Sequence, residues 1–116
     1  PANYRTQLAA LRPGDVLVLS SGTYGQGLPL SSMAGTAAQP IVIRGPEDQS
    51  AVFTARSCCN TVQLDSTRHV EIRNLTLDGL NLPGPFAVDS RGSSHNITLE
   101  NLRIVNHGAD QQIVGI

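Results

Sequence analysis

The first residues of the chain place apolar side chains at the spacing of a helix. Tyr4, Leu8 and Leu11 stand at i, i+4 and i+7, which makes one apolar stripe. This spacing predicts a short helix over residues 3–11, and the Pro-Gly pair at 13–14 ends it.

From residue 15 onward the period changes to two, with glycine, proline and asparagine between the apolar stretches. Alternation of this kind predicts short strands rather than helices. We expect extended segments at 16–19, 41–43 and 51–55, and a turn at 20–23. Residues 25–39 are small and polar, so we expect an irregular segment in which Leu28 and Leu30 pack against an apolar partner.

The second half of the chain repeats itself. When it is shifted by 27 residues, 66–77 overlies 93–104, with identical residues at 66/93, 74/101 and 75/102 and apolar residues at 70/97, 72/99 and 77/104. The preceding strand also repeats: 62–66 matches 86–90, with a slip of three residues in the turn. A third copy begins at 113. Internal repeats of this length are typical of solenoids.

Each repeat holds three short strands, which in the first complete unit are 62–64, 70–73 and 75–77. A single asparagine, Asn74 or Asn101, separates the second strand from the third, and asparagine tolerates the left-handed backbone of a sharp corner. We therefore predict an all-β parallel β-helix in which these two structural asparagines stack. A β-sandwich is the rival fold, but the Asn-Gly dipeptide typical of its hairpins is absent.

The two ends of the chain differ. Residues 1–14 are expected to cap the apolar end of the coil, and residues 15–116 to form its rungs. The last residue, Ile116, falls inside an apolar strand, which would leave an exposed edge. We therefore expect further rungs of the same protein beyond it.

Composition narrows the function classes. The net charge of −1 excludes the basic surface of a nucleic-acid binder, and no apolar run is long enough to span a membrane. All eight cationic side chains are arginines, a composition typical of GC-rich bacterial genomes. Cys58 and Cys59 are adjacent, which is neither a disulfide framework nor a metal-ligand spacing; their redox state is open.

Four segments together resemble one known group of proteins: AALRPGDVLVL (9–19), SGTY (21–24), GTAAQPIVIRG (35–45) and HVEIRNLTLDG (69–79). They resemble the N-terminal part of right-handed, single-stranded parallel β-helix proteins of the pectate-lyase-like superfamily, most closely the alginate lyase and chondroitinase B family. The resemblance covers residues 3–116. Epimerases, hydrolases and non-catalytic surface proteins share the same opening.

The resemblance implies a secreted, periplasmic or cell-surface protein that cleaves uronic-acid polysaccharide by β-elimination. In that family a lysine acts as the base and an arginine as the acid, often with Ca²⁺ on the substrate carboxylate. This sequence contains no lysine, so we assign no catalytic residue and no cofactor within the chain and place the active site beyond residue 116. The alternative is a non-catalytic extracellular β-helix that binds carbohydrate or has a structural role.

Four residues are candidate substrate contacts: Gln63, Asp65, Asp89 and Arg91. Gln63, with Ala87 and Val114, should face outward from the sheet where the superfamily binds sugar. Arg91 is expected in the long corner after Asp89, and it has the chemistry to bind a uronate carboxylate. The matched repeats would stack Asp65 and Asp89 at about 4.8 Å, a pair that requires water, a shared proton or a cation such as Ca²⁺. The simpler interpretation is that each Asp-Ser pair caps a turn in water.

One further pair of side chains has metal-binding chemistry. His69 and His95 fall in neighbouring columns of consecutive repeats, but no third ligand stands in register, so we assign no metal site.

Overall fold

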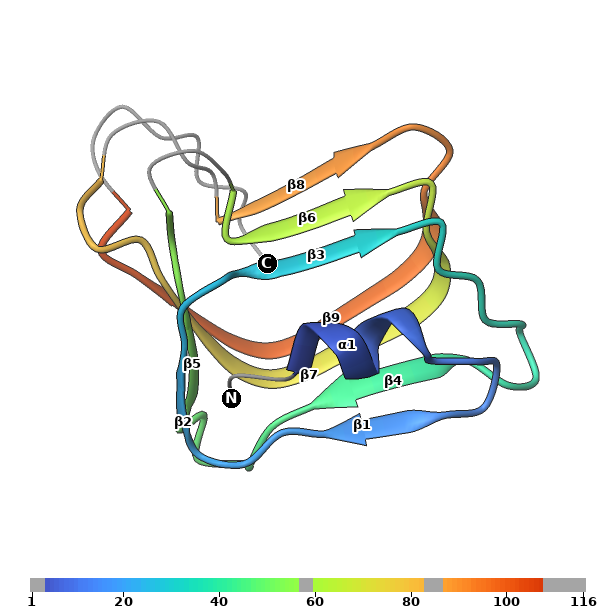
Figure 1. Cartoon of the computed structure of the whole chain (residues 1–116), viewed down its shortest axis with the longest axis horizontal. Helices are drawn as coiled ribbons and strands as arrows, with labels where there is room; N and C mark the ends of the chain where they lie inside the picture. Colours follow the sequence, from blue (N-terminus) through green and yellow to red (C-terminus); the bar gives the residue numbers. More distant parts are fainter. Residues whose placement is uncertain (1–3, 57–59, 83–86, 108–116) are drawn as a thin grey trace.

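The computed structural model describes residues 4–56, 60–82 and 87–107. Within these ranges the chain winds as a coil of short parallel strands, one turn stacked on the next, with a helix at its N-terminal end (Figure 1). We call each turn of the coil a rung. The cysteine pair and residues 108–116, which include the start of the predicted third repeat, lie outside the described residues.

Helix α1 spans Tyr4–Ala9, within the predicted 3–11. The first rung holds β1 (Val16–Val18), β2 (Gly22–Tyr24) and β3 (Leu28–Ser31), and the second holds β4 (Ile41–Arg44), β5 (Ala51–Thr54) and β6 (Val62–Asp65). The third holds β7 (Arg68–Asp78) and β8 (Val88–Arg91), and β9 (His95–Val105) belongs to the fourth. The six-residue helix α1 is far too short to cross a membrane, and no other helix is described.

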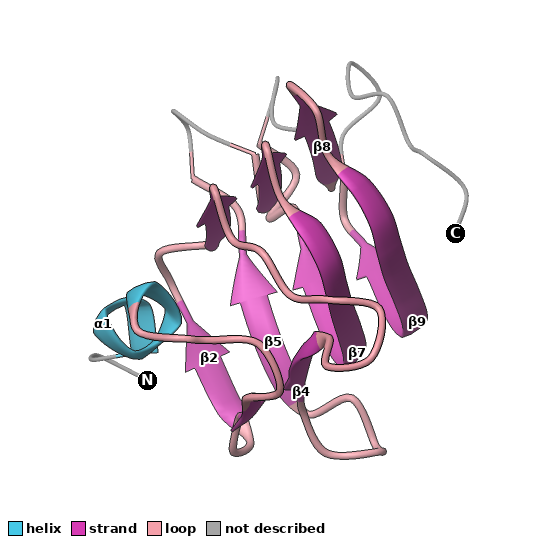
Figure 2. Ribbon diagram, turned by 90° about the vertical axis from the view of Figure 1, so that its right-hand side faces the viewer, coloured by secondary structure: helices cyan, strands magenta, loops and turns pink. Residues whose placement is uncertain are grey.

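Every pair of strands in the described coil is parallel and joins one rung to the next. β3, β6 and β8 form one sheet, and the other six strands form a bent sheet in which β7 contacts β4, β5 and β9 (Figure 2). β7 and β9 pair with partners 27 residues apart, such as Val70 with Ile97, as the repeat predicts. The predicted fold, a parallel β-helix with a short N-terminal helix, is confirmed.

The bend within β7 and within β9 is a single asparagine. Asn74 and Asn101 both have left-handed backbone, with φ of 62° and 55°. Their side chains stack: the Asn101 amide donates to the Asn74 side-chain oxygen at 3.0 Å, and the Asn74 amide donates to the carbonyl of Gly45 at 3.3 Å. The corner is thus held by side-chain bonds that run from rung to rung.

The core is a column of inward-facing aliphatic side chains closed at one end by aromatic rings. Tyr24 and Phe53 stack with ring centroids 4.7 Å apart, and Tyr4 of α1 meets both rings edge-on. The Tyr4 hydroxyl donates to the carbonyl of Gly27 at 2.5 Å, and burial raises the pKa of this phenol. Leu8 of the same helix is 4% exposed. Helix α1 therefore covers the apolar end of the first rung.

Two strands appear where the pattern predicts none. A turn was expected at 20–23, but residues 22 and 23 belong to β2, whose Tyr24 reaches the core. Residues 28–31 were expected to be irregular, but they form β3. Its Leu28 and Leu30 point inward and pair with Val62 and Leu64 of the next rung. Two apolar residues are therefore enough to make a strand when a neighbouring strand pairs with them. β3 is the first strand of its sheet, an edge position at which Pro29 is tolerated.

The loop between β4 and β5 bonds to two other rungs. The Thr76 hydroxyl donates to the carbonyl of Gln49 at 2.7 Å, and the Gln49 side chain donates to the carbonyl of Asn101 at 2.9 Å. Asn101 in turn donates to the carbonyl of Glu47 at 3.5 Å. This loop, residues 46–50, therefore ties the second rung directly to the fourth as well as to the third.

Gly35 lies where the backbones of two rungs approach closely. A Cβ there would overlap the carbonyl oxygen of His69 and the backbone nitrogen of Ile41, which cannot move without breaking the coil. We expect Gly35→Ala to lower the free energy of unfolding by about 1–3 kcal/mol, measured by urea denaturation. Gly25→Ala is the matched control, because the nearest atom lies 3.9 Å away at Thr54 Oγ1. Equal stability of the two variants would contradict the packing described.

Candidate functional site

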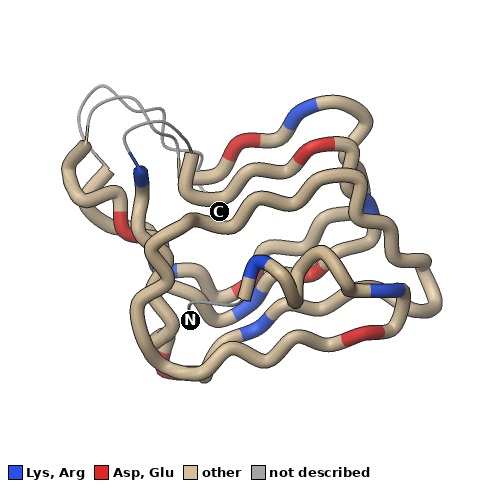
Figure 3. Tube along the Cα trace, in the orientation of Figure 1, with Lys and Arg blue, Asp and Glu red and all other residues tan. Residues whose placement is uncertain are grey.

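The outer surface of the β3–β6–β8 sheet carries the candidate residues from the sequence. Strands β6 and β8 bear charged positions along this surface, whereas β3 bears none (Figure 3). Because side chains alternate along a strand, two outward columns run up the sheet. We call these six residues the β3–β6–β8 face: Pro29, Gln63 and Asp89 in one column, and Ser31, Asp65 and Arg91 in the other.

The predicted stacking of Asp65 on Asp89 is wrong. Asp89 pairs with Gln63, 26 residues earlier, and Arg91 pairs with Asp65. The repeats had been matched at an offset of 24 because both contain Asp-Ser, with a three-residue slip in the turn. The corner 92–94 is one residue longer than the corner 66–67, so the slip is only one residue. Both offsets are even, which preserves the face on which each side chain lies.

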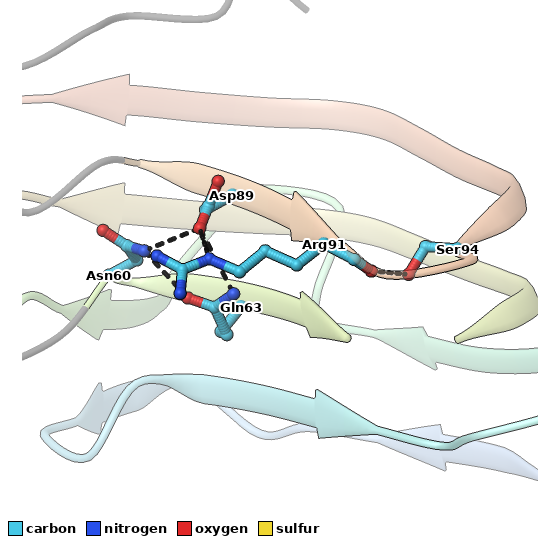
Figure 4. A network of polar contacts seen from close by, with 5 residues as sticks. All are labelled: Asn60, Gln63, Asp89, Arg91 and Ser94. Atoms are coloured by element: carbon cyan, nitrogen blue, oxygen red, sulfur yellow. Dashed lines mark hydrogen bonds and ion pairs between the residues drawn. The ribbon is translucent and has the colours of Figure 1, made fainter. Parts of the chain in front are cut away.

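In this register Asp89 does not face another carboxylate but is hydrogen-bonded to its neighbours. The Gln63 amide donates to Asp89 Oδ2 at 3.3 Å, and the Arg91 Nε–H donates to the same oxygen at 2.7 Å (Figure 4). The Asn60 amide donates to Asp89 Oδ2 at 3.2 Å and to Gln63 Oε1 at 2.8 Å. Asn60, Gln63, Asp89 and Arg91 form what we call the Asp89 network.

Exposure within the network is uneven. The Asp89 side chain is 19% exposed, whereas the Arg91 side chain is 68% exposed. Asp89 Oδ2 is therefore held by three donors, and the guanidinium of Arg91 lies beside the amides of Asn60 and Gln63 (Figure 4). Within the described residues, the terminal nitrogens of Arg91 form no ion pair or hydrogen bond. The network thus holds the guanidinium of Arg91 in a fixed orientation at the surface.

Ser94 supports this arrangement at the corner after β8. The Ser94 hydroxyl donates to the carbonyl of Arg91 at 3.0 Å and accepts from the backbone N–H of Thr67 at 3.1 Å. Asp65 stays outside the network: it is exposed and bonds the Ser66 hydroxyl at 3.3 Å. Asp65 and Ser66 stand at the corner after β6, but Asp89 and Ser90 lie within β8, so the interpretation of both Asp-Ser pairs as capped turns is wrong for the second pair.

The sequence pattern misplaced one residue and missed another. Ala87, expected to face outward, is 1% exposed, because it lies at the corner before β8 begins. Asn60 was not a candidate, although a polar side chain two residues before a strand can reach the first outward positions of that strand. Val114 lies outside the described residues.

The residues of this face do not fit a calcium site. Ca²⁺ requires six or more oxygen ligands, but Asp89 Oδ2 already accepts three N–H donors, one of them cationic. Within the part of the chain that the structure describes, no group of three His, Cys, Asp or Glu side chains is placed to hold a metal ion. The rings of His69 and His95 lie 5.9 Å apart between centroids, edge to face.

A second charged surface lies on β4, β7 and β9, around a hollow of about 640 Å³. There Arg73 bridges Glu71 at 2.5 Å and Glu100 at 3.2 Å. Since both terminal nitrogens of Arg73 are paired, this cluster is an ion network between rungs, and it offers less to an anionic ligand than Arg91 does.

The fold and its N-terminal helix place the chain in the class of parallel β-helix structures. One similar solved structure is an arginine-to-alanine variant of the PL6 family alginate lyase AlyGC, with a TM-score of 0.69 and 20% sequence identity. The match covers 90% of this chain and 14% of the lyase chain. No family model and no curated protein matches the sequence.

Proposed function

We propose that the chain is the N-terminal part of a polysaccharide-active β-helix, and that the complete protein cleaves uronic-acid polymers by β-elimination. The likeness in fold to an alginate lyase supports this proposal. The observation that carries it is the exposed, oriented guanidinium of Arg91 on the β3–β6–β8 face.

Arg91 has the chemistry of a carboxylate receptor. Its Nε–H donates to Asp89, which fixes the plane of the guanidinium. The two terminal nitrogens of Arg91 are left for a ligand. A uronate carboxylate can accept two parallel hydrogen bonds from such a group. The amides of Asn60 and Gln63 lie beside it and bond to Asp89, so they help to hold the carboxylate that orients the guanidinium.

The lysine that the resemblance implies as the base at the scissile bond is absent from this chain. A β-elimination needs a base to remove the proton α to the carboxylate and an acid to protonate the leaving oxygen. We place these groups on rungs that follow residue 116, because the chain contains no lysine. In this proposal the residues of the present chain bind and orient the polymer.

The test is the ultraviolet absorbance of the unsaturated sugar product, measured with the full-length protein on alginate, chondroitin and pectin. We expect product from at least one polymer. Arg91→Ala should raise KM by about 10-fold or more, since a hydrogen bond to a charged group contributes about 1.5–3 kcal/mol. Arg103→Ala, an exposed arginine on β9, is the matched control and should leave KM unchanged.

A second function, binding without cleavage, is favoured by one observation. The carboxylate bonded to Arg91 is not available as a base, because Asp89 Oδ2 already accepts from three donors. Retained affinity for uronate polymers with no unsaturated product from any of them would support this function and exclude the lyase.

A further inference from the structure

Helix α1 and strand β3 enclose a small hollow at the N-terminal end of the coil. Its volume is about 190 Å³, and it is lined by Arg5, Leu8, Ala9, Pro29, Ser31 and Met33. Drug-sized ligands occupy pockets of about 300–1,000 Å³, so this hollow suits a single small ring.

The hollow continues the β3–β6–β8 face. Pro29 and Ser31, which line it, are the lowest members of the two outward columns that end in Asp89 and Arg91. β3 and β8 are separated by two strand spacings, which places them about 10 Å apart. A ligand that lies along the coil axis therefore meets Arg91 at one end of the face and the hollow at the other.

The lining of the hollow combines an apolar floor with one cation. Leu8 is 4% exposed, and Pro29 and Met33 are half-buried, so they offer a surface for the C–H face of a sugar ring. Arg5 is exposed, and no described residue forms an ion pair with it. The Ser31 hydroxyl is also exposed at the rim. An acidic sugar has both an apolar face and a carboxylate to match this lining.

We propose that the hollow between α1 and β3 binds one acidic sugar unit of the same polymer that contacts Arg91, with Arg5 receiving its carboxylate. This inference rests on the proposed function, and it names a second contact point on the ligand. It gives α1 a role in binding besides its role as a cap. A neutral sugar lacks the carboxylate for Arg5, so the hollow selects for uronate.

The experiment is calorimetric titration of the protein with uronate oligomers of increasing length, with a neutral glucan oligomer as the ligand control. We expect affinity to rise once an oligomer is long enough to reach from Arg91 to the hollow. Arg5→Ala should remove that rise, weakening long oligomers about 3- to 10-fold and leaving short ones unchanged. Arg12→Ala, an exposed arginine beyond α1, is the matched control and should bind as the parent does.

A second variant separates the hollow from general electrostatics. Ala9 is exposed at the end of α1, and Ala9→Trp fills the hollow while keeping the charge of Arg5. We expect the same loss of affinity for long oligomers. Thermal unfolding of each variant shows whether it remains folded.

The outcomes distinguish the two proposals. If Arg5→Ala and Ala9→Trp bind all lengths as the parent does while Arg91→Ala is impaired, the hollow is not a subsite and the proposed function stands. If only the Arg5 and Ala9 variants are impaired, the hollow stands and the role of Arg91 falls. Equal binding of the neutral oligomer overturns the selection for uronate, and no binding of any uronate oligomer overturns both proposals.

Discussion

Replacement of Phe53 by alanine is expected to lower the free energy of unfolding by about 3–5 kcal/mol, the usual cost of truncating a fully buried aromatic side chain. Phe53 is 0% exposed and its ring joins Tyr24 and Tyr4 in one cluster. The substitution removes the layer on which helix α1 rests. Chemical denaturation followed by far-ultraviolet circular dichroism measures the change.

Val18→Ala is the matched control for Phe53→Ala, because Val18 is 62% exposed on β1 and its loss leaves no cavity. We expect a change within about 0.5 kcal/mol. A loss below about 1 kcal/mol for Phe53→Ala would mean that the aromatic cluster does not close the coil.

The second large effect on the free energy of unfolding is expected for the corner residue Asn74. Asn74→Ala places a residue without a polar side chain in left-handed backbone and breaks the bonds to Gly45 and Asn101. Backbone strain and unpaired groups together should cost about 2–4 kcal/mol of unfolding free energy. The same denaturation experiment measures it.

Two controls divide this cost into its parts. Asn96 has φ of 55°, close to that of Asn74, but it is exposed, and its side chain forms no hydrogen bond with the described residues. Asn96→Ala should therefore report backbone strain alone. Asn74→Gly relieves the strain and keeps the loss of hydrogen bonds. Equal costs for Asn74→Ala and Asn96→Ala would show that the stacked amides contribute nothing.

Much of the fold could be predicted because the third and fourth rungs follow one pattern with little variation. The asparagine corner fixes the register between β7 and β9, so the 27-residue offset is visible in the sequence. The first rung has no such marker. β3 contains only two apolar residues, and whether Leu28 and Leu30 form a strand depends on the rung above them.

The candidate site was harder to predict than the fold. Arg91 was expected in the corner after Asp89, but it is the last residue of β8. The sequence placed Gln63 and Asp89 on the correct face, because alternation survives any even shift of register. It paired them wrongly, because one additional residue at the corner 92–94 decides which side chain lies above which. Contacts between rungs depend on loop length, which a pattern of apolar residues does not encode.

The loop at 46–50 has a consequence for how the coil unfolds. In a solenoid whose turns touch only their immediate neighbours, damage at one end propagates by single steps. The bonds of Gln49 and Glu47 to Asn101 bypass the intervening turn, so detachment of β9 pulls directly on the loop below β7. This bypass should sharpen the melting transition of the segment from β4 to β9 and make it open as one cooperative block under force.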